Sequence, residues 1–378
     1  MMATAEPKSP PAKPVTVMTR NVYLGADITR PVEAAVGAAA QPDASKPTIV
    51  TALANATHVT RAIVDRTNFD VRGRLLADEI ADTQPDLIGL QEVALWRHGP
   101  LQLNQVGVTN AETVDYDFLQ VLLDHLNERG TPYDAASIAD RADVESPSFI
   151  GSIASPGGNA RDIRLTMRDV VLMRASSSLT PLDAHQDVYD ANLHAGAAGV
   201  SFDFDRGYQW VDVRAGAQDF RFVNTHLEAF SSDIALAQAD ELFTEATSPN
   251  RSTLVVCDCN SDPANGSVRP IDRVPHKAPY EMLTGAGGYT DLWKASGRPA
   301  DLPGLNHGET SGLNETVDEA PPGSWTHRID MVFGRTADAK ELTADRAQVT
   351  GRDGDPRDPA TGLWPSDHAG VVMRVRGL

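Results

Sequence analysis

The chain has 378 residues, of which 41% are hydrophobic, enough to form one large domain or two small ones with a sizeable core. No apolar run approaches the roughly 20 residues that a membrane-spanning helix needs. The formal net charge of −19 at pH 7 argues against a protein that tracks long stretches of nucleic acid, because phosphate neutralisation needs clustered Lys and Arg. It does not exclude a nuclease, since bound cations can invert the local sign of an acidic cleft.

Residues 1–14 are rich in Pro and Ala and contain no apolar segment. We therefore predict a flexible lead here, with no intact signal peptide. A trimmed secreted protein with an added start Met would begin in this way. Secretion is our expectation, and a cytoplasmic location is the alternative.

The predicted strands are short β-branched runs that end in polar residues. In chain order these strands are Val15–Arg20, Leu87–Leu90, Asp169–Arg174, Gln209–Val213, Phe220–Asn224, Thr253–Cys257, Ile329–Phe333 and Val371–Val375. Helical spacing of apolar residues predicts helices over Val71–Thr83, Tyr116–Arg129 and Asp233–Thr247. This mixture predicts an α+β fold, a four-layered α/β/β/α sandwich in which helices flank two packed mixed sheets.

Long segments between these elements are predicted to be loops. They are Pro31–Asn68, Trp96–Val114, Ser146–Met167, Ser296–Ser324 and Gly351–Pro365. Irregular stretches of this length are usually functional or mobile. The sequence has no internal repeat and no linker composition, so we expect residues 15–378 to form one domain with long loop insertions.

Polar groups follow one another at the ends of the predicted strands. In chain order they are Arg20-Asn21-Val22-Tyr23, Gln91-Glu92-Val93, Asn224-Thr225-His226-Leu227-Glu228, Asp258-Cys259-Asn260-Ser261-Asp262, Arg328-Ile329-Asp330 and Ser366-Asp367-His368. In this order they resemble the endonuclease/exonuclease/phosphatase superfamily, which includes deoxyribonuclease I-like nucleases, inositol polyphosphate phosphatases and bacterial sphingomyelinases. Each motif alone is weak, but six in the order of the family, over nearly the whole chain, are specific.

The resemblance implies a site for a divalent metal ion, Mg²⁺ or alternatively Mn²⁺ or Ca²⁺. Hard cations of this kind prefer oxygen ligands and keep several waters, so one or two carboxylates suffice. Glu92 would be the principal ligand, Asp367 would face the same or a second metal, and Asn21 would support the site or bind phosphate. Taken singly, Glu92 would more often cap a loop, and Asn21 would more often be a turn residue.

The resemblance also assigns the groups that act on the phosphate. Asp258 would position or deprotonate the attacking water, while Asn260 and His226 would hydrogen-bond the phosphate and stabilise its charge. Asp330 would orient the imidazole of His368. By itself, the stretch after Asp258 is also typical of an Asx turn, and His226 would usually bind nearby backbone. The complete set provides what in-line displacement at phosphorus needs.

Cys257 and Cys259 are the only cysteines. They occupy positions where the family commonly has Gly and an aromatic residue, and we expect this to change local packing without loss of activity. Because one residue separates them in a predicted strand, we expect their side chains to point to opposite faces and to form no disulfide. A metal–thiolate site is disfavoured, since zinc sites need four ligands in a consistent spacing.

Three tryptophans, Trp96, Trp325 and Trp364, each fall within a few residues of a predicted site position. We expect them to bind substrate from loops at the rim of the cleft, by stacking on a base, gripping an organic headgroup or touching a lipid interface. The alternative is that they pin long loops to the body of the protein. Four further residues in predicted loops would overhang the cleft, namely Arg161, Arg164, Arg168 and His307.

The leading hypothesis is a metal-dependent phosphoesterase that hydrolyses a phosphodiester. A phospholipid or organic headgroup diester is favoured because Asn21-Val22-Tyr23-Leu24 resembles the first motif of sphingomyelinases, although no apolar insertion hairpin is evident. The alternatives are a nuclease acting on DNA or RNA, a phosphatase of a soluble phosphometabolite, a catalytically silent binding protein and a thiol-dependent enzyme. We expect a monomer that binds a phosphate ester, contacts membrane surfaces transiently and does not bind long nucleic acid tightly.

Overall fold

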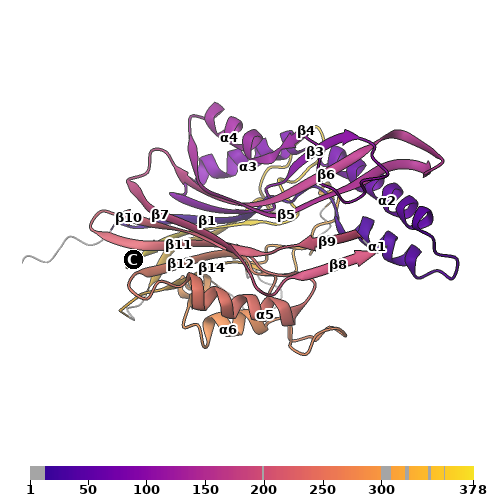
Figure 1. Ribbon diagram of the computed structural model, residues 1–378. Coiled ribbons are helices and arrows are strands. Elements are labelled where there is room, and N and C mark those ends of the chain that lie inside the picture. Colours follow the sequence, from indigo (N-terminus) through magenta and orange to yellow (C-terminus); the bar gives the residue numbers. More distant parts are fainter. Residues whose placement is uncertain (1–12, 198–199, 299–307, 320–322, 339–341, 353) are drawn as a thin grey trace, which may run out of the picture.

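The computed structural model describes residues 13–197, 200–298, 308–319, 323–338, 342–352 and 354–378. Two mixed β-sheets pack face to face, and helices cover their outer faces (Figure 1). The predicted four-layered α/β/β/α sandwich is therefore confirmed. No helix in the described ranges is long and apolar enough to cross a membrane.

The first sheet has eight strands, in the order β15-β16-β1-β2-β6-β3-β4, with β5 paired to β6. Their bounds are β1 (Val15–Asn21), β2 (Leu87–Gln91), β3 (Leu95–Pro100), β4 (Thr113–Asp117), β5 (Tyr133–Ser152), β6 (Ser155–Arg174), β15 (Thr343–Thr350) and β16 (Gly370–Arg376). Strands β1 and β2 run parallel, and β16 runs antiparallel to β1.

The second sheet has six strands, in the order β13-β14-β12-β11-β10-β7. Their bounds are β7 (Leu179–Val188), β10 (Gly207–Ala215), β11 (Gln218–His226), β12 (Ser252–Asp258), β13 (Thr290–Asp291) and β14 (Asp330–Arg335). Strands β11 and β12 run parallel, and β14 runs antiparallel to β12. A separate pair is formed by β8 (Leu193–Ala197) and β9 (Val200–Phe204).

The helices form the outer layers. Their bounds are α1 (Thr29–Ala39), α2 (Lys46–Arg66), α3 (Phe69–Thr83), α4 (Phe118–Glu128), α5 (Ser232–Glu241), α6 (Ala278–Thr284) and α7 (Leu292–Ala295), with a π-helical turn (Leu242–Ala246) after α5. Helices α3 and α4 cover the first sheet, and α5 and α6 cover the second (Figure 1). Helix α2 packs on β5, away from the centre of the sandwich.

The periodic apolar residues of strands and helices meet in three buried layers. Leu76 and Ile80 of α3 are fully buried against the first sheet, and Leu283 of α6 is fully buried against the second. Phe220 and Leu254 lie between the two sheets. Full burial of one such side chain stabilises the fold by roughly 1.5–3 kcal/mol, so these layers fix the sheets relative to each other.

The two sheets approach each other closely at Gly89, just below their polar edge. A Cβ atom at Gly89 would lie 2.3 Å from a methyl carbon of Val256 and 2.5 Å from the side-chain oxygen of Asn224, so only glycine fits there. Next to it, the Gln91 amide donates to Asn224 Oδ1 at 2.7 Å, and the Asn224 amide donates to the carbonyl of Leu90 at 3.0 Å. These bonds hold the carboxyl ends of β2 and β11 together.

Two of the predicted loops are wrong. The segment Pro31–Asn68 contains α1 and α2, and Ser146–Met167 lies mostly in the long β5–β6 hairpin. Helix α2 starts at Ser45, whose hydroxyl accepts from the backbone N–H of Thr48. The buried face of α2 includes the polar residues Thr57, Thr60 and Arg61, which interrupt its apolar pattern. In the β5–β6 hairpin, pairing between the strands overrides the low β-propensity of the many Asp and Ala residues.

The other three predicted loops agree better with the structure. Strands β3 and β4 occupy only the two ends of Trp96–Val114. The described parts of Ser296–Ser324 and Gly351–Pro365 contain no helix or extended strand. Of the predicted lead, residues 1–12 lie outside the described residues.

Candidate active site

The strand order of the first sheet brings three predicted motifs to one edge. The parallel strands β1 and β2 end at Asn21 and Gln91, so Glu92 follows at the same edge. Because β16 runs antiparallel to β1, the segment just before its first residue also lies there, and this segment contains Asp367 and His368. Residues almost 350 positions apart in sequence thus become neighbours.

The second sheet supplies the other half of the site. The register pairs His226 at the end of β11 with Asp258 at the end of β12, and pairs Asp258 with Asp330 at the start of β14. The Asp330 N–H and the preceding Ile329 N–H donate to the hydroxyl of Thr310 at 3.1 and 3.2 Å. The pairing of β11, β12 and β14 therefore places His226, Asp258 and Asp330 side by side.

A pocket of about 300 Å³ opens where these edges meet. Six predicted site residues line it, namely Glu92, His226, Asp258, Asn260, Asp367 and His368. Asn21 and Asp330 lie behind it and hydrogen-bond residues of its wall. All eight polar residues predicted from the sequence are thus brought together.

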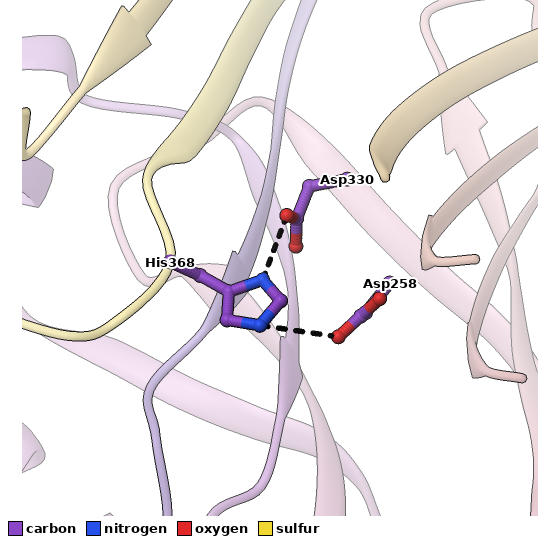
Figure 2. Close-up of side chains that lie close together, drawn as sticks. All are labelled: Asp258, Asp330 and His368. Carbon is purple, nitrogen blue, oxygen red and sulfur yellow. Dashed lines mark hydrogen bonds and ion pairs between the residues drawn. The ribbon is translucent and has the colours of Figure 1, made fainter. Parts of the chain in front are cut away.

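His368 and Asp330 form a carboxylate–histidine pair (Figure 2). Nδ1 of His368 is 2.8 Å from Asp330 Oδ2, and its Nε2 is 3.7 Å from Asp258 Oδ2. Burial opposes the charged imidazolium, but the three carboxylates of Asp330, Asp258 and Asp367 outweigh it and raise the pKa of His368 well above its ordinary value. The ligand atoms of Asp258, Asp330 and His368 lie within 4.8 Å of one another, a cluster that could hold a metal ion.

Asp258 is the most highly connected carboxylate of the site. Its Oδ2 accepts from the Asn21 amide at 3.0 Å and lies 3.4 Å from His226 Nε2, while its Oδ1 accepts from the backbone N–H of Asn260 at 3.1 Å. Burial raises the pKa of Asp258 to about 7, and the nearby carboxylate of Asp330 also acts to raise it. A carboxyl group with this pKa can exchange protons near neutral pH.

Glu92 and Asp367 are two carboxylates of the pocket that are not neutralised by an arginine or lysine. Both line the pocket, and within the described ranges neither forms an ion pair with Lys or Arg. Burial raises the pKa of Asp367 to about 6, and Glu92 also acts to raise it. Two half-buried carboxylates that repel each other fit a divalent cation with oxygen ligands.

Asn21 supports these carboxylates from behind. Its amide nitrogen donates to Glu92 Oε1 at 3.1 Å as well as to Asp258, and its side-chain oxygen accepts from the backbone N–H of Tyr23 at 2.8 Å. The second oxygen of Glu92 accepts from the backbone N–H of Leu24 at 3.0 Å. The position of Asn21 therefore matches the supporting role among its two predicted roles.

Arg206 also lines the pocket, although it was not predicted from the sequence. Its Nη1 lies 2.7 Å from Nδ1 of His226. Burial lowers the pKa of His226 well below its ordinary value, and the charges of Arg206 and His368 add to this. His226 is therefore neutral at pH 7, in contrast to His368.

Three residues that line the pocket have left-handed backbone. The φ angles are 58° at Tyr23, 61° at Glu92 and 42° at Asn260. Such conformations cost of order 1–3 kcal/mol for residues other than Gly, and they cluster at active sites. At Asn260 the turn is held by the side chain, whose amide donates to the carbonyl of Leu227 at 3.0 Å.

A fully buried arginine connects the two loops of the first-sheet edge. The Arg72 guanidinium donates to the carbonyls of Val22, Tyr23 and Pro365 at 2.7, 3.0 and 3.2 Å. It has no carboxylate partner among the described residues, and burial lowers its pKa to about 10. Arg72 thus ties the segment after Asn21 to the segment before Asp367.

The tryptophan prediction is wrong. Trp96, Trp325 and Trp364 are only 3%, 7% and 4% exposed, and none of the three lines the pocket. Trp96 donates to the carbonyl of Leu24 at 2.9 Å, and the rings of Trp325 and Trp364 pack edge to face at 6.0 Å. Burial of these large apolar rings outweighs exposure at the rim, so they pin loops to the body, as the alternative held.

The cysteine prediction is also wrong, because Cys257 and Cys259 form a disulfide. Side chains two positions apart in a strand point to the same face, and β12 ends between the two cysteines, at Asp258. Their Cα atoms are 5.0 Å apart, within the range that a disulfide spans. The disulfide encloses Asp258.

The arginines predicted to overhang the cleft lie in β6 and point elsewhere. Arg164 binds Asp143 at 2.5 Å, and Arg168 binds Asp117 at 2.6 Å. Neither these two nor Arg161 lines the pocket. His307 lies outside the described residues.

The structure is similar to solved structures of endonuclease/exonuclease/phosphatase proteins. A protein of this description from Bacteroides vulgatus has a TM-score of 0.54 at 15% identity, with 96% of this chain and 99% of the other covered. The mannosyl-6-phosphatase Bt3783 of Bacteroides thetaiotaomicron has a TM-score of 0.52 at 14% identity, with 96% and 100% covered. TDP2 of D. rerio, solved with a single-strand DNA product, has a TM-score of 0.50 at 14% identity, with 96% and 99% covered.

In sequence, the chain matches no protein-family model and no curated protein. At identities of 14–15%, the structural similarity concerns the fold. The roles of the site residues therefore rest on the geometry of this chain.

Proposed function

The chain has the fold of the endonuclease/exonuclease/phosphatase superfamily, and from this premise we propose that it is a divalent-metal-dependent phosphodiesterase. The observation that carries the proposal is the convergence of unlike groups on one pocket. Asp258, with a pKa of about 7, faces His226, which is neutral, and His368, which is cationic. Groups whose environments push their pKa values apart are typical of acid–base sites.

Each group has a task in the hydrolysis. Asp258 accepts a proton from the attacking water, whose oxygen forms the new bond to phosphorus as the ester bond breaks. The leaving alkoxide takes up a proton from solvent and departs as the alcohol. Nε2–H of His226 and the imidazolium of His368 donate to the non-bridging oxygens, where negative charge accumulates. Asp330 keeps His368 charged and oriented through the 2.8 Å bond to Nδ1.

Glu92 and Asp367 are the residues proposed to hold the cation. The imidazole of His368 is protonated and has no free lone pair for a metal, which favours these two carboxylates over the Asp258–Asp330–His368 cluster. When bound, a cation such as Mg²⁺ supplies positive charge that stabilises the phosphate in the transition state. Asn21 supports the Glu92 carboxylate at 3.1 Å.

The pocket supports a compact organic or phospholipid headgroup as the substrate. Its volume of about 300 Å³ is at the small end of ligand sites, and Phe230 on its wall is 45% exposed. Asp27 adds negative charge to the wall, whereas Glu315 is paired with Arg30 at 2.7 Å. An acidic, partly apolar pocket disfavours a polyanion and suits a neutral or cationic headgroup.

The disulfide between Cys257 and Cys259 supports secretion, since disulfides persist in oxidising compartments. The exposed ring of Phe230 supports transient contact of the pocket rim with a lipid surface. The location is tested by immunoblotting the culture medium and the cells of the native source. Detection in the cell fraction alone would contradict secretion.

The function is tested by assaying hydrolysis of bis-p-nitrophenyl phosphate, p-nitrophenylphosphocholine, p-nitrophenyl phosphate, plasmid DNA and sphingomyelin vesicles. Each assay is run with EDTA and again after Mg²⁺ is restored, with Asp258→Asn as the control for contaminating activity. We expect the diesters to be cleaved, the activity to vanish with EDTA, and the phosphocholine diester to be preferred.

Other outcomes would change the proposal in defined ways. Preference for plasmid DNA would indicate a nuclease, and preference for the monoester would indicate a phosphatase. Activity that survives EDTA would contradict metal dependence. If no substrate is cleaved with Mg²⁺, Mn²⁺ or Ca²⁺, the catalytic proposal is wrong and a binding function on this scaffold replaces it.

A further inference from the structure

Arg206 is held rigidly at the wall of the pocket. It lies between β9 and β10, where its backbone N–H donates to Asn192 Oδ1 at 2.7 Å and its carbonyl accepts from the N–H of Tyr189 at 2.9 Å. The residue is 8% exposed. A side chain anchored from both sides of its backbone has little freedom to turn away from the pocket.

The guanidinium of Arg206 forms no ion pair among the described residues, although its charge acts on the buried carboxylate of Asp169. No carboxylate lies within ion-pair distance, and its Nε is buried without a hydrogen bond. The buried carboxylate of Asp169 binds Arg141 instead, at 3.2 Å. A buried charge without a partner is strongly unfavourable, which indicates that an anion completes this site.

The contact between Arg206 and His226 determines which nitrogen of the imidazole has the proton. A guanidinium can only donate, so Nδ1 of His226, 2.7 Å from Arg206 Nη1, must accept. The proton of the neutral ring is therefore on Nε2, on the side of Asp258 Oδ2 at 3.4 Å. Arg206 thus makes His226 a hydrogen-bond donor toward the pocket.

We propose that Arg206 is a phosphate-binding residue that acts together with His226. The Arg206 guanidinium and Nε2–H of His226 bind non-bridging oxygens of the phosphate, and Arg206 also fixes the tautomer that lets His226 donate. This inference rests on the proposed phosphoesterase function. The ligand class is a phosphate group with at least two free oxygens, because two separate donors must be satisfied.

Binding of inorganic phosphate to the Mg²⁺-loaded protein, measured by calorimetry, tests this role without catalysis. We compare the wild type with Arg206→Met, Arg206→Lys and the control Arg221→Met, whose arginine binds Asp212 away from the pocket. Since hydrogen bonds to charged groups are strong, Arg206→Met should weaken phosphate binding about 10- to 100-fold. Arg206→Lys keeps the charge and should lose less, and Arg221→Met should change the affinity less than about twofold.

The tautomer of His226 is read from its ring ¹⁵N chemical shifts. We expect Nε2 to be protonated in the wild type and a mixture of tautomers in Arg206→Met, a signature that loss of stability alone would not produce. Thermal melting of each variant shows whether it is folded, and Arg206→Lys provides the comparison if Arg206→Met is not.

The two proposals fail in distinguishable ways. If the wild type cleaves phosphodiesters and Arg206→Met binds phosphate as tightly as the wild type, only the role of Arg206 is wrong. If the wild type neither cleaves phosphate esters nor binds phosphate, the proposed function is wrong and the inference about Arg206 fails with it.

Discussion

The two ends of strand β16 have clusters of charged residues that differ in how completely their charges are paired. At its C-terminal end, Arg374 and Arg376 bind Asp345 of β15 at 2.6 and 2.5 Å, and the hydrogen bond from Arg374 holds the pKa of Asp345 well below its usual range. Just before its first residue, Asp367 lies in the pocket without an ion pair to Lys or Arg among the described residues, and burial raises its pKa to about 6.

The difference lies in burial and pairing. At the Asp345 end, two cations satisfy one half-exposed carboxylate, so the cluster stabilises the fold slightly and needs nothing else. At the pocket end, the half-buried carboxylates of Glu92 and Asp367 repel each other, and the guanidinium of Arg206 forms no ion pair among the described residues. Charges that remain unbalanced in the folded chain point to ligands that balance them, here a cation and a phosphate.

The largest effect is expected for Asp258→Asn, which removes the proton acceptor but keeps the shape of the side chain. Turnover of the diester substrate should fall about 100- to 10,000-fold. The melting temperature should stay the same or rise, since burial raises the pKa of Asp258 and its charge therefore opposes folding at pH 7. Near-normal turnover in this variant would sink the assignment of Asp258.

The second effect concerns Glu92, one of the two carboxylates assigned to the cation. Substituting a residue that only supports a metal ligand already lowers metal affinity about 10- to 100-fold. Because Glu92 is assigned as a direct ligand, Glu92→Gln should raise the Mg²⁺ concentration for half-maximal rate by at least this factor. The Mg²⁺ dependence of the hydrolysis rate measures it. An unchanged Mg²⁺ dependence would remove Glu92 from the metal site.

A smaller effect is expected for the disulfide that encloses Asp258. A loop of three residues gives only about 1.6 kcal/mol of loop-closure stabilisation, so Cys257→Ser with Cys259→Ser should lower the free energy of unfolding by roughly 2 kcal/mol at most. Turnover should fall about tenfold, because small displacements of a catalytic group are costly. Urea unfolding and hydrolysis rates test this, and a large loss of stability with full activity would reverse the interpretation.

The smallest effect is expected at the balanced end of β16. Asp345→Asn should lower the free energy of unfolding at pH 7 by less than about 1 kcal/mol and leave hydrolysis unchanged. The pKa of Asp345 is lower in the folded than in the unfolded state, so its ion pairs stabilise the fold above a pH of about 4 and are lost below it. The difference between variant and wild type in urea unfolding should therefore shrink as the pH falls below that value.

The sequence predicted those parts of the site that depend on strand ends. Apolar runs ending in Asn21, Glu92, His226 or Asp258 are local patterns, and parallel pairing brings such ends together. Their roles remain predictions that the experiments above test. The buried tryptophans were misjudged because proximity in sequence to a site residue does not decide which face of a loop is buried.

Other features depend on contacts that no local pattern encodes. Arg206 directly precedes β10 and reaches His226 at the end of the neighbouring strand β11, and nothing in its local sequence distinguishes it from Arg164, which binds Asp143 on the hairpin. The length of the β5–β6 hairpin also follows from pairing between its strands, since its Asp- and Ala-rich sequence has low β-propensity.

We expect the unpaired carboxylates of the pocket, Glu92 and Asp367, to bind a cation, whereas Asp345, which is paired with two arginines, should not. Calorimetric titration of the EDTA-stripped protein with Mn²⁺ measures this directly in the wild type, Glu92→Gln and Asp345→Asn. We predict saturable binding in the wild type that is unchanged in Asp345→Asn and is lost or at least tenfold weaker in Glu92→Gln. Equal binding by the wild type and Glu92→Gln would contradict the account.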